Sequence, residues 1–356
     1  MRIAFVLPSM QQSGPGIQIN TLIPWLIKLG AEVEIFYFRD TDGVVLDTKG
    51  IRCQKIVPLR LKKQLEKFDV VHTNGFFPDI INVIIGLVHK RIIRVTTLHN
   101  FITEDFANRY PPLKCWLFSS FWLCILRFIP NKIVFTEIAR RYYLQKIPGK
   151  LHIVGSGVPV DRILNLLRDS SSYETESIKT IFDFRSKGLK IIGSTSVISK
   201  VKGLEVVIKG LVNLTDHAAV FVGGGPDEKS LQNLSVELGV SERVVFLGFQ
   251  KNPIFFMRFF DIYAMTSSSE AFGLSLFEAI ACQVPIVCNR IPVFEELLSD
   301  DLVCFYDGSP SDFSAKVLRS NNNKRERRAF DYLLLNYDVS IISKKYYSLY
   351  NELISK

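Results

Sequence analysis

The sequence predicts an α/β protein built from two doubly wound, Rossmann-like domains. Short apolar runs rich in Val, Ile and Phe alternate with longer segments of helical periodicity, and this alternation occurs twice along the 356 residues. Strands that are apolar throughout are typical of parallel sheets covered by helices on both faces. A chain of this length also favours two domains over one.

The strand candidates fall into two groups that are separated by helical patterns. In the first half they are residues 2–7, 32–38, 69–72, 92–98 and 132–136. In the second half they are residues 189–194, 218–223, 243–248, 261–265, 284–288 and 302–305. The clearest helical patterns of the first half are residues 21–29, 79–88 and 137–146. Because helical segments separate the strands, we expect parallel pairing within each domain.

The domain boundary is expected between Val158 and Lys190, a range that contains the most loop-like segment of the chain, residues 168–177. We therefore predict an N-terminal domain over residues 1–160 and a C-terminal domain over residues 161–335. The remaining residues, 336–356, are predicted to form a terminal helix.

The net charge of +9 is unevenly placed. Residues 1–150 hold 21 Lys and Arg against 11 Asp and Glu, so the whole basic excess lies in the N-terminal half. Such an excess indicates an anionic partner: a membrane surface, a lipid phosphate or nucleic acid. Basic segments 59–67 and 89–91, with Arg94 and the apolar segment 113–129, are candidates for a face that meets an anionic bilayer, and a solvated helix face is the alternative. We find no interleaving of basic and aromatic residues and expect no nucleic acid partner.

The apolar segment 113–129 approaches the length of a membrane span. Lys114, Arg127 and the Ser119-Ser120 pair interrupt it, whereas a span has about 20 apolar residues with few charges. We expect a buried core helix, and an interfacial helix or a true span remain alternatives.

The strongest chemical pattern follows the strand candidate 261–265, where ligands of doubly wound domains bind. Glu270 lies in the loop after this strand, Gly273 permits a tight turn, and a helix begins near Leu274. The free N–H groups of a helix start hold anions such as a diphosphate. With Glu278 inside the helix, the pattern suits a nucleotide sugar, which carries phosphates and several hydroxyls. On spacing alone, both glutamates are equally consistent with ordinary loop and helix positions.

Five segments in this half, taken together, resemble glycosyltransferase family 4. They are FVGGGPDE at 221–228, RVVFLGF at 243–249, DIY at 261–263, EAFGLSLFEA at 270–279 and VPIV at 284–287. The resemblance implies the GT-B fold, in which two Rossmann-like domains face each other and C-terminal helices return to the first domain. It also implies a transfer reaction that retains the anomeric configuration.

The resemblance implies a role for each matching position. Glu278 would bind the ribose hydroxyls of the donor, and Glu270 would contact the donor sugar beside its anomeric carbon. Lys202 matches the lysine that binds the diphosphate, where a fixed cation stabilises the charge of the leaving group. The backbone of the loop would hold the sugar and the distal phosphate, at Phe272, Gly273 and Leu274.

The N-terminal half matches this family more loosely. Gly14 and Gly16 occupy the place of the glycine loop that approaches the phosphates, although a Gly-Pro-Gly sequence is otherwise a simple turn. His99 matches a histidine beside the donor sugar, although a histidine at a strand end is commonly structural. We assign His99 and Glu270 to the catalytic site.

The chain departs from the pattern of the family at two positions. Val197 stands where an arginine usually provides a second cation for the diphosphate, and Lys200 is a candidate to replace it. Gln283 stands where a glycine is usual. With Val197 in place of the arginine, a weakened transferase activity is an alternative to full activity.

No metal ion or other cofactor is expected besides the nucleotide-sugar co-substrate. Asp40-Thr41-Asp42 spells the D-x-D motif of metal-dependent glycosyltransferases, but those have a different fold. We interpret it as a solvated loop.

The sequence therefore predicts a retaining hexosyltransferase that uses a UDP- or GDP-linked sugar. The acceptor is expected to be a glycan, in particular one linked to a lipid diphosphate, as in O-antigen or capsule synthesis. A catalytically degenerate GT-B scaffold and a sugar-nucleotide epimerase are the alternatives. Six cysteines without metal or pairing spacing, and no recognisable signal peptide, favour the cytoplasm, at the inner face of the membrane.

Overall fold

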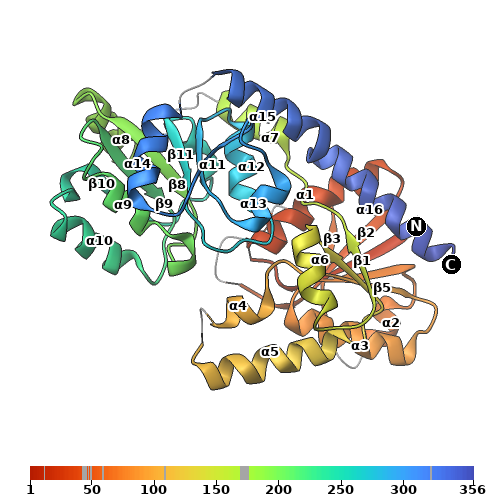
Figure 1. Ribbon diagram of the computed structural model, residues 1–356. Helices are drawn as coiled ribbons and strands as arrows, with labels where there is room; N and C mark the ends of the chain where they lie inside the picture. The colour runs from red at the N-terminus through yellow and green to blue at the C-terminus, as the bar shows by residue number, and fades with distance from the viewer. Residues whose placement is uncertain are drawn as a thin grey trace. The chain divides into compact units, whose positions relative to one another are not determined.

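A computed structural model of the protein describes most of the chain, in residues 1–11, 13–41, 46, 48, 50–57, 60–107, 110–168, 176–320 and 323–356. The chain divides into two compact units (Figure 1). The first unit comprises Met1–Val158 and Asn336–Lys356, and the second comprises Pro159–Leu335. Each unit has its own sheet and hydrophobic core.

The first unit is built on a parallel sheet whose seven described strands lie in the order β3-β2-β1-β4-β5-β6-β7. They are β1 (Arg2–Ser9), β2 (Glu32–Arg39), β3 (Arg52–Lys55), β4 (Val70–Thr73), β5 (Ile93–Thr97), β6 (Asn131–Val134) and β7 (Lys150–Ile153). The strand order changes direction between β1 and β4. Their carboxyl ends therefore form the switch point where ligands bind in such sheets.

Helices cover both faces of this sheet. On one face, α1 (Gly14–Lys28) packs with α16 (Val339–Ile354), the last helix of the chain. The hydroxyl of Tyr350 on α16 lies 2.6 Å from Nδ1 of the buried His72 on β4, which ties the C-terminal helix to the sheet. On the other face lie α2 (Leu61–Leu65) and α3 (Phe76–Val88). The remaining helices of this unit are α4 (Ile102–Ala107), α5 (Pro112–Leu126) and α6 (Glu137–Leu144).

The second unit repeats the design, with six described strands in the order β10-β9-β8-β11-β12-β13. They are β8 (Lys190–Thr195), β9 (His217–Val222), β10 (Val244–Phe246), β11 (Ile262–Met265), β12 (Ile286–Asn289) and β13 (Cys304–Tyr306). The order changes direction between β8 and β11, so the switch point lies at their carboxyl ends. The prediction of two doubly wound domains is confirmed.

The helices of the second unit also pack on the sheet, and α9 and α14 share a core cluster with β8 and β9. They are α7 (Val160–Arg168), α8 (Glu176–Ser186), α9 (Glu205–Gly210), α10 (Glu228–Glu237), α11 (Ile254–Met257), α12 (Leu274–Ala281), α13 (Pro292–Leu297), α14 (Pro310–Arg319) and α15 (Asn323–Asn336). Two short 3₁₀ helices, η2 (Lys200–Lys202) and η3 (Ser241–Arg243), lie in the connections.

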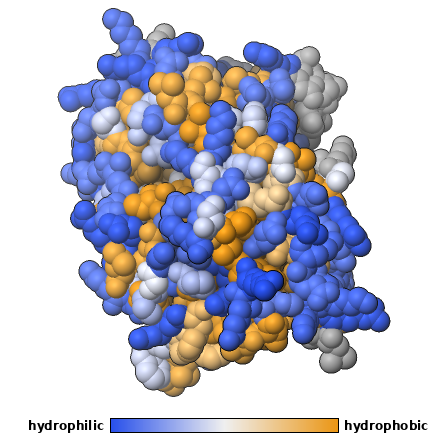
Figure 2. All heavy atoms as spheres, turned by 90° about the vertical axis from the view of Figure 1, so that its right-hand side faces the viewer, coloured by the Kyte–Doolittle hydropathy of each residue, from blue (hydrophilic) through white to orange (hydrophobic). Residues whose placement is uncertain are grey.

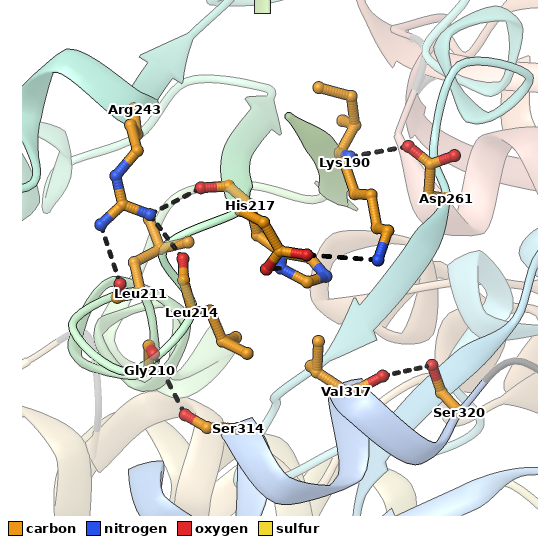
Figure 3. Close-up of polar contacts among 12 residues, drawn as sticks. Lys190, Gly210, Leu211, Leu214, His217, Arg243, Asp261, Ser314, Val317 and Ser320 are labelled. Carbon is orange, nitrogen blue, oxygen red and sulfur yellow. Dashed lines mark hydrogen bonds and ion pairs between the residues drawn. The ribbon is translucent and has the colours of Figure 1, made fainter. Parts of the chain in front are cut away.

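A polar network holds the amino edge of the second sheet, the edge opposite the switch point (Figure 3). The Arg243 guanidinium donates hydrogen bonds of 2.6 to 2.8 Å to three backbone carbonyls, those of Leu211, Leu214 and His217. Lys190 lies 3.2 Å from Asp216 and is more exposed. The guanidinium thus adds charged hydrogen bonds to the connection from α9 to β9, where the carbonyls of Leu211 and Leu214 also accept backbone N–H groups.

Helix α5 contradicts the expectation of a buried core helix for residues 113–129. Its buried residues are Cys115, Ser119 and Leu126, whereas Trp116 is 64% exposed and Phe121 is 55% exposed. The helix packs against α3 and α4 on one side and is open on the other (Figure 1). In the described part of the chain, no helix is both long and apolar enough to cross a membrane.

We predict that Arg243→Met lowers the free energy of unfolding by about 2–3 kcal/mol, because three backbone carbonyls lose their hydrogen bonds to a charged donor. Urea unfolding followed by circular dichroism measures the change. Lys190→Met is the matched control, since its exposed ion pair contributes less than about 1 kcal/mol. Equal losses for the two variants would contradict this role of Arg243.

Candidate active site

The loops after β8 and β11 are bound to each other along their backbones. The Thr266 hydroxyl donates to the Lys202 carbonyl oxygen (2.6 Å), and the Ser268 N–H donates to the Val201 carbonyl oxygen (2.8 Å). Gly203 has a φ of 61°, and a Cβ at this position would lie 2.3 Å from the Thr266 carbonyl oxygen. Only glycine permits this approach.

This contact brings two of the predicted residues together. Lys202 Nζ lies 2.5 Å from Glu270 Oε1, and the two side chains are 26% and 14% exposed. Lys202 also lines a recess at the carboxyl ends of β8 and β11. The recess is lined largely by hydroxyl-bearing side chains, and its residues are Ser194, Thr195, Ser196, Lys202, Tyr263, Met265, Thr266, Ser267 and Ser275.

The start of α12 faces the same loop and is suited to hold an anion. Gly273 is its N-cap, with a φ of 82°, and a Cβ there would lie 2.5 Å from the Phe294 ring. Phe272 is buried and stacks on Phe277, which fixes the chain just before the helix. In the described structure no side chain caps this end, so N–H groups of the first turn, which begins at Leu274, remain available to a ligand.

Glu278 lies in α12, a little more than one turn after its start. Burial raises the pKa of its carboxyl group to about 8. Among the described residues the carboxyl group has no hydrogen-bond partner, although Tyr263 and Cys282 lie within electrostatic reach. Hydrogen bonds from the hydroxyl groups of a ligand would stabilise the ionised form of such a buried, unpartnered carboxyl group.

The two departures from the family pattern have different structural consequences. The Val197 side chain is 63% exposed, so this position has room for a larger residue. Lys200 is exposed on η2. Gln283 has a φ of 55° and is the one described residue other than glycine with positive φ, which explains why a glycine is suited to this position.

In the first unit, His99 follows β5 and binds a residue that the sequence analysis missed. Its Nε2 lies 2.8 Å from Oδ1 of Asn74, which follows the neighbouring strand β4. Burial lowers the pKa of His99 to about 3, so the ring is neutral at physiological pH. Because Oδ1 only accepts, Nε2 carries the proton and Nδ1 is free to accept. The Nδ2 atom of Asn74 is buried and has no partner among the described residues.

Gly14 and Gly16 form the first turn of α1, which starts beyond the carboxyl end of β1. The Ser13 hydroxyl caps this helix by accepting from the Gly16 N–H (3.4 Å). A Cβ on Gly14 would meet nothing within 4 Å, whereas one on Gly16 would lie 3.0 Å from the Gln11 carbonyl oxygen. Gly14 therefore leaves open space beside the helix start.

The predicted residues thus form two groups, each within one unit. Gly14, Gly16 and His99 lie at the carboxyl edge of the first sheet, and the remaining ones lie at the carboxyl edge of the second sheet. Sequence reasoning missed Asn74, Thr195, Tyr263 and Ser275. The available signal was their position at or after the ends of β4, β8 and β11 and at the start of α12.

The D-x-D sequence lies partly outside the described residues, since Asp42 is not among them. Asp40 is exposed and forms an ion pair with Lys55. Within the described ranges, no three or more His, Cys, Asp or Glu side chains are grouped so that they could hold a metal ion.

Two protein-family models match the chain. The model described as Glycosyltransferase Family 4 matches residues 13–162, and the model described as Glycosyl transferases group 1 matches residues 178–332. These ranges include both groups of site residues.

Individual relatives agree with the family models. The O-antigen biosynthesis glycosyltransferase WclY of Escherichia coli is 26% identical and covers 99% of both chains. A transferase of Campylobacter jejuni is 29% identical over 49% of this chain and 52% of its own. It is named N-acetylgalactosamine-N,N'-diacetylbacillosaminyl-diphospho-undecaprenol 4-alpha-N-acetylgalactosaminyltransferase.

The fold has counterparts among solved structures. The crystal structure of Anabaena Alr3699/HepE in complex with UDP superposes with a TM-score of 0.77 at 18% identity, over 99% of this chain and 100% of the other. Taken with the two family models, which together match most of the chain, these findings place it: the protein has the GT-B fold, is a glycosyltransferase and belongs to glycosyltransferase family 4.

Proposed function

We propose that the protein is a metal-independent hexosyltransferase that retains the anomeric configuration and uses a UDP- or GDP-linked sugar. The observation that carries this proposal is the arrangement around α12. A cation, Lys202, is held beside Glu270 in front of an uncapped helix start, and Glu278 lies one turn further on. In this proposal, Lys202 and the helix start bind the diphosphate of the donor, Glu270 contacts its sugar, and Glu278 binds its ribose. The UDP bound to the structurally similar Anabaena protein supports a nucleotide donor.

In the proposed reaction, the donor diphosphate binds the N–H groups at the start of α12 and the ammonium group of Lys202. One of the three N–H donors of the ammonium group serves Glu270, which leaves two for phosphate oxygens. The bond between the anomeric carbon and the phosphate oxygen breaks, and the electron pair leaves with the nucleoside diphosphate. The acceptor hydroxyl attacks from the same face, and its proton passes to the departing phosphate. Lys202 and the helix start stabilise the charge that develops.

The proposed acceptor is a glycan linked to a lipid diphosphate, in the assembly of a bacterial surface polysaccharide such as O-antigen. The activities by which the Escherichia coli and Campylobacter jejuni relatives are named support this class. We also propose that the protein works as a peripheral protein at the inner face of the cell membrane, where such acceptors are available. The basic excess of residues 1–150 supports this location.

A catalytically degenerate scaffold is the alternative that Val197 favours, because one diphosphate cation is absent from its usual place. It differs from the proposal in one measurable property. A scaffold binds the donor without hydrolysing it, whereas a transferase without acceptor slowly hydrolyses its donor. Lys202→Ala is expected to reduce this hydrolysis by about 10²–10³-fold. An epimerase would release no nucleoside diphosphate.

We predict that one nucleotide class among UDP- and GDP-sugars raises the melting temperature of the protein. A ligand at about 100 times its Kd stabilises the folded state by about 2.7 kcal/mol. Differential scanning fluorimetry measures the shift. Glu278→Ala should abolish it, whereas Glu237→Ala, an exposed glutamate on α10, should leave it unchanged. A folded protein that no nucleotide sugar stabilises would refute the donor site.

Donor affinity is predicted to rise as the pH increases from about 6 to 8 and then to level off. Hydroxyl donors of the ribose favour the ionised carboxylate, and the pKa of Glu278 in the free protein is about 8. Below that pH, donor binding must first release a proton, so affinity falls as the solution becomes more acidic. Titration calorimetry across this range measures the effect. Glu278→Gln should remove the pH dependence, and a pH-dependent variant would argue for another titrating group.

Val197→Arg is predicted to raise kcat/KM for donor hydrolysis by about tenfold, which corresponds to ~1.4 kcal/mol of added transition-state stabilisation. The exposed side chain at this position leaves room for a guanidinium that can reach the diphosphate. Val197→Leu is the control for size. If the arginine variant gains nothing over the leucine variant, the diphosphate does not pass this position.

A further inference from the structure

We propose that the outer surface of α3 and α5 in the first unit docks on an anionic lipid bilayer. The proposal rests on the proposed function, because a lipid-linked acceptor requires the enzyme to work at a membrane. It adds the surface that makes the contact and the depth at which that surface lies.

The apolar part of this surface is centred on α5. Five of its large apolar side chains are between 47% and 69% exposed: Leu113, Trp116, Leu117, Phe118 and Phe121. Exposed apolar groups on a soluble surface are normally scattered, and a contiguous patch marks an interaction site. A helix of 15 residues is too short to span a bilayer, but it can lie in the interface with its aromatic side chains at headgroup depth.

Helix α3 extends the patch. Its side chains Phe77, Ile84, Leu87 and Val88 are 40% to 77% exposed. The Phe76 ring lies 5.7 Å from Phe121 and 5.9 Å from Trp122, so the two helices are in direct contact. Figure 2 shows some apolar residues, in orange, at the lower edge of the face that it draws, at the level where Figure 1 draws α3 and α5.

The inner side of α5 is already fixed to its own unit. The Trp122 indole N–H donates to Asp79 Oδ2 (2.8 Å), and Asp79 also accepts from the hydroxyls of Thr73 and Thr96. Asp79 is fully buried. The helix is therefore anchored through its inner side, and its outer side is the surface left for a partner.

The charges around the patch select an anionic partner. Between Asp79 and Glu137 the acidic residues are Glu104 and Asp105, both on α4. Exposed cations flank the patch, and they are Lys62, Lys63, Lys90, Arg91, Lys114 and Arg127. The His89 ring lies 3.3 Å from the Lys62 carbonyl oxygen, which places the cations of α2 beside those that follow α3. Arg94, which the sequence analysis included, instead donates inward to the Phe128 carbonyl oxygen.

An anionic bilayer matches both properties of this surface. Its interface accepts the aromatic side chains, and its headgroups attract the flanking cations. A second copy of the chain fits less well, because two such surfaces would bring like charges together.

Flotation of the full-length protein with vesicles tests the proposal. We expect binding to vesicles that contain phosphatidylglycerol and little binding to phosphatidylcholine alone. Trp116→Ser combined with Phe121→Ser should reduce binding about tenfold or more. Lys90→Gln combined with Arg91→Gln should reduce it about fivefold per charge. The matched control is Val236→Ser with Leu318→Ser, which removes side chains of similar exposure from the second unit.

Vesicle binding that does not depend on the content of anionic lipid would overturn the proposal. So would flotation of the Trp116→Ser, Phe121→Ser variant to the same extent as the wild type. A concentration-dependent dimer that is lost in this variant, without vesicle binding, would assign the surface to a second copy. The donor-induced thermal shift is measured on the same samples. If a variant loses vesicle binding but keeps the donor-induced thermal shift, the substituted residues act in docking and not in donor binding. If the wild type binds vesicles but shows no thermal shift with any donor, the donor site is refuted and the docking surface is not.

Discussion

The close approach of two backbone segments, at Gly203 and Thr266, determines the geometry of the second unit's site. β8 and β11 are neighbours in the sheet although residues 196–261 lie between them in the sequence, so the loops that follow the two strands emerge side by side. Hydrogen bonds between the loops hold η2 against the segment before α12. Lys202 and Glu270 meet because of this contact. Any side chain at position 203 would push the loops apart and separate the cation from the carboxylate.

The same contact bears on the proposed diphosphate site, where Val197 leaves one cation of the family pattern absent. The ion pair holds the ammonium group of Lys202 in place before a ligand arrives, so little side-chain entropy is lost on binding. The start of α12 adds N–H groups that need no further organisation. In the proposed site, the Lys202–Glu270 ion pair and the start of α12 would therefore bind the diphosphate without the second cation that the family usually provides.

The sequence predicted most of the strands and the loop before α12, because their spacing follows local rules of strand, turn and helix start. It did not point to Thr195, Tyr263 and Ser275, which line the recess of the second unit. It could not predict contacts between distant segments, such as Asn74 with His99 or Asp79 with Trp122. The exposure of α5 was also missed, for a physical reason. The hydropathy of a segment indicates how much free energy its burial would contribute. It does not indicate whether other elements of the fold cover the segment.

The connection from β4 to α3 links the two functional regions of the first unit. Within seven residues it carries Thr73 and Asp79, which anchor α5, and Asn74, which holds His99. Gly75, with a φ of 96°, allows the chain to turn between them. A helix of 13 residues is about 20 Å long, so no part of α3 lies further than about this distance from its own start at the carboxyl edge of the sheet. In the proposed docking, a membrane-borne acceptor would therefore meet His99 while its lipid stays in the bilayer.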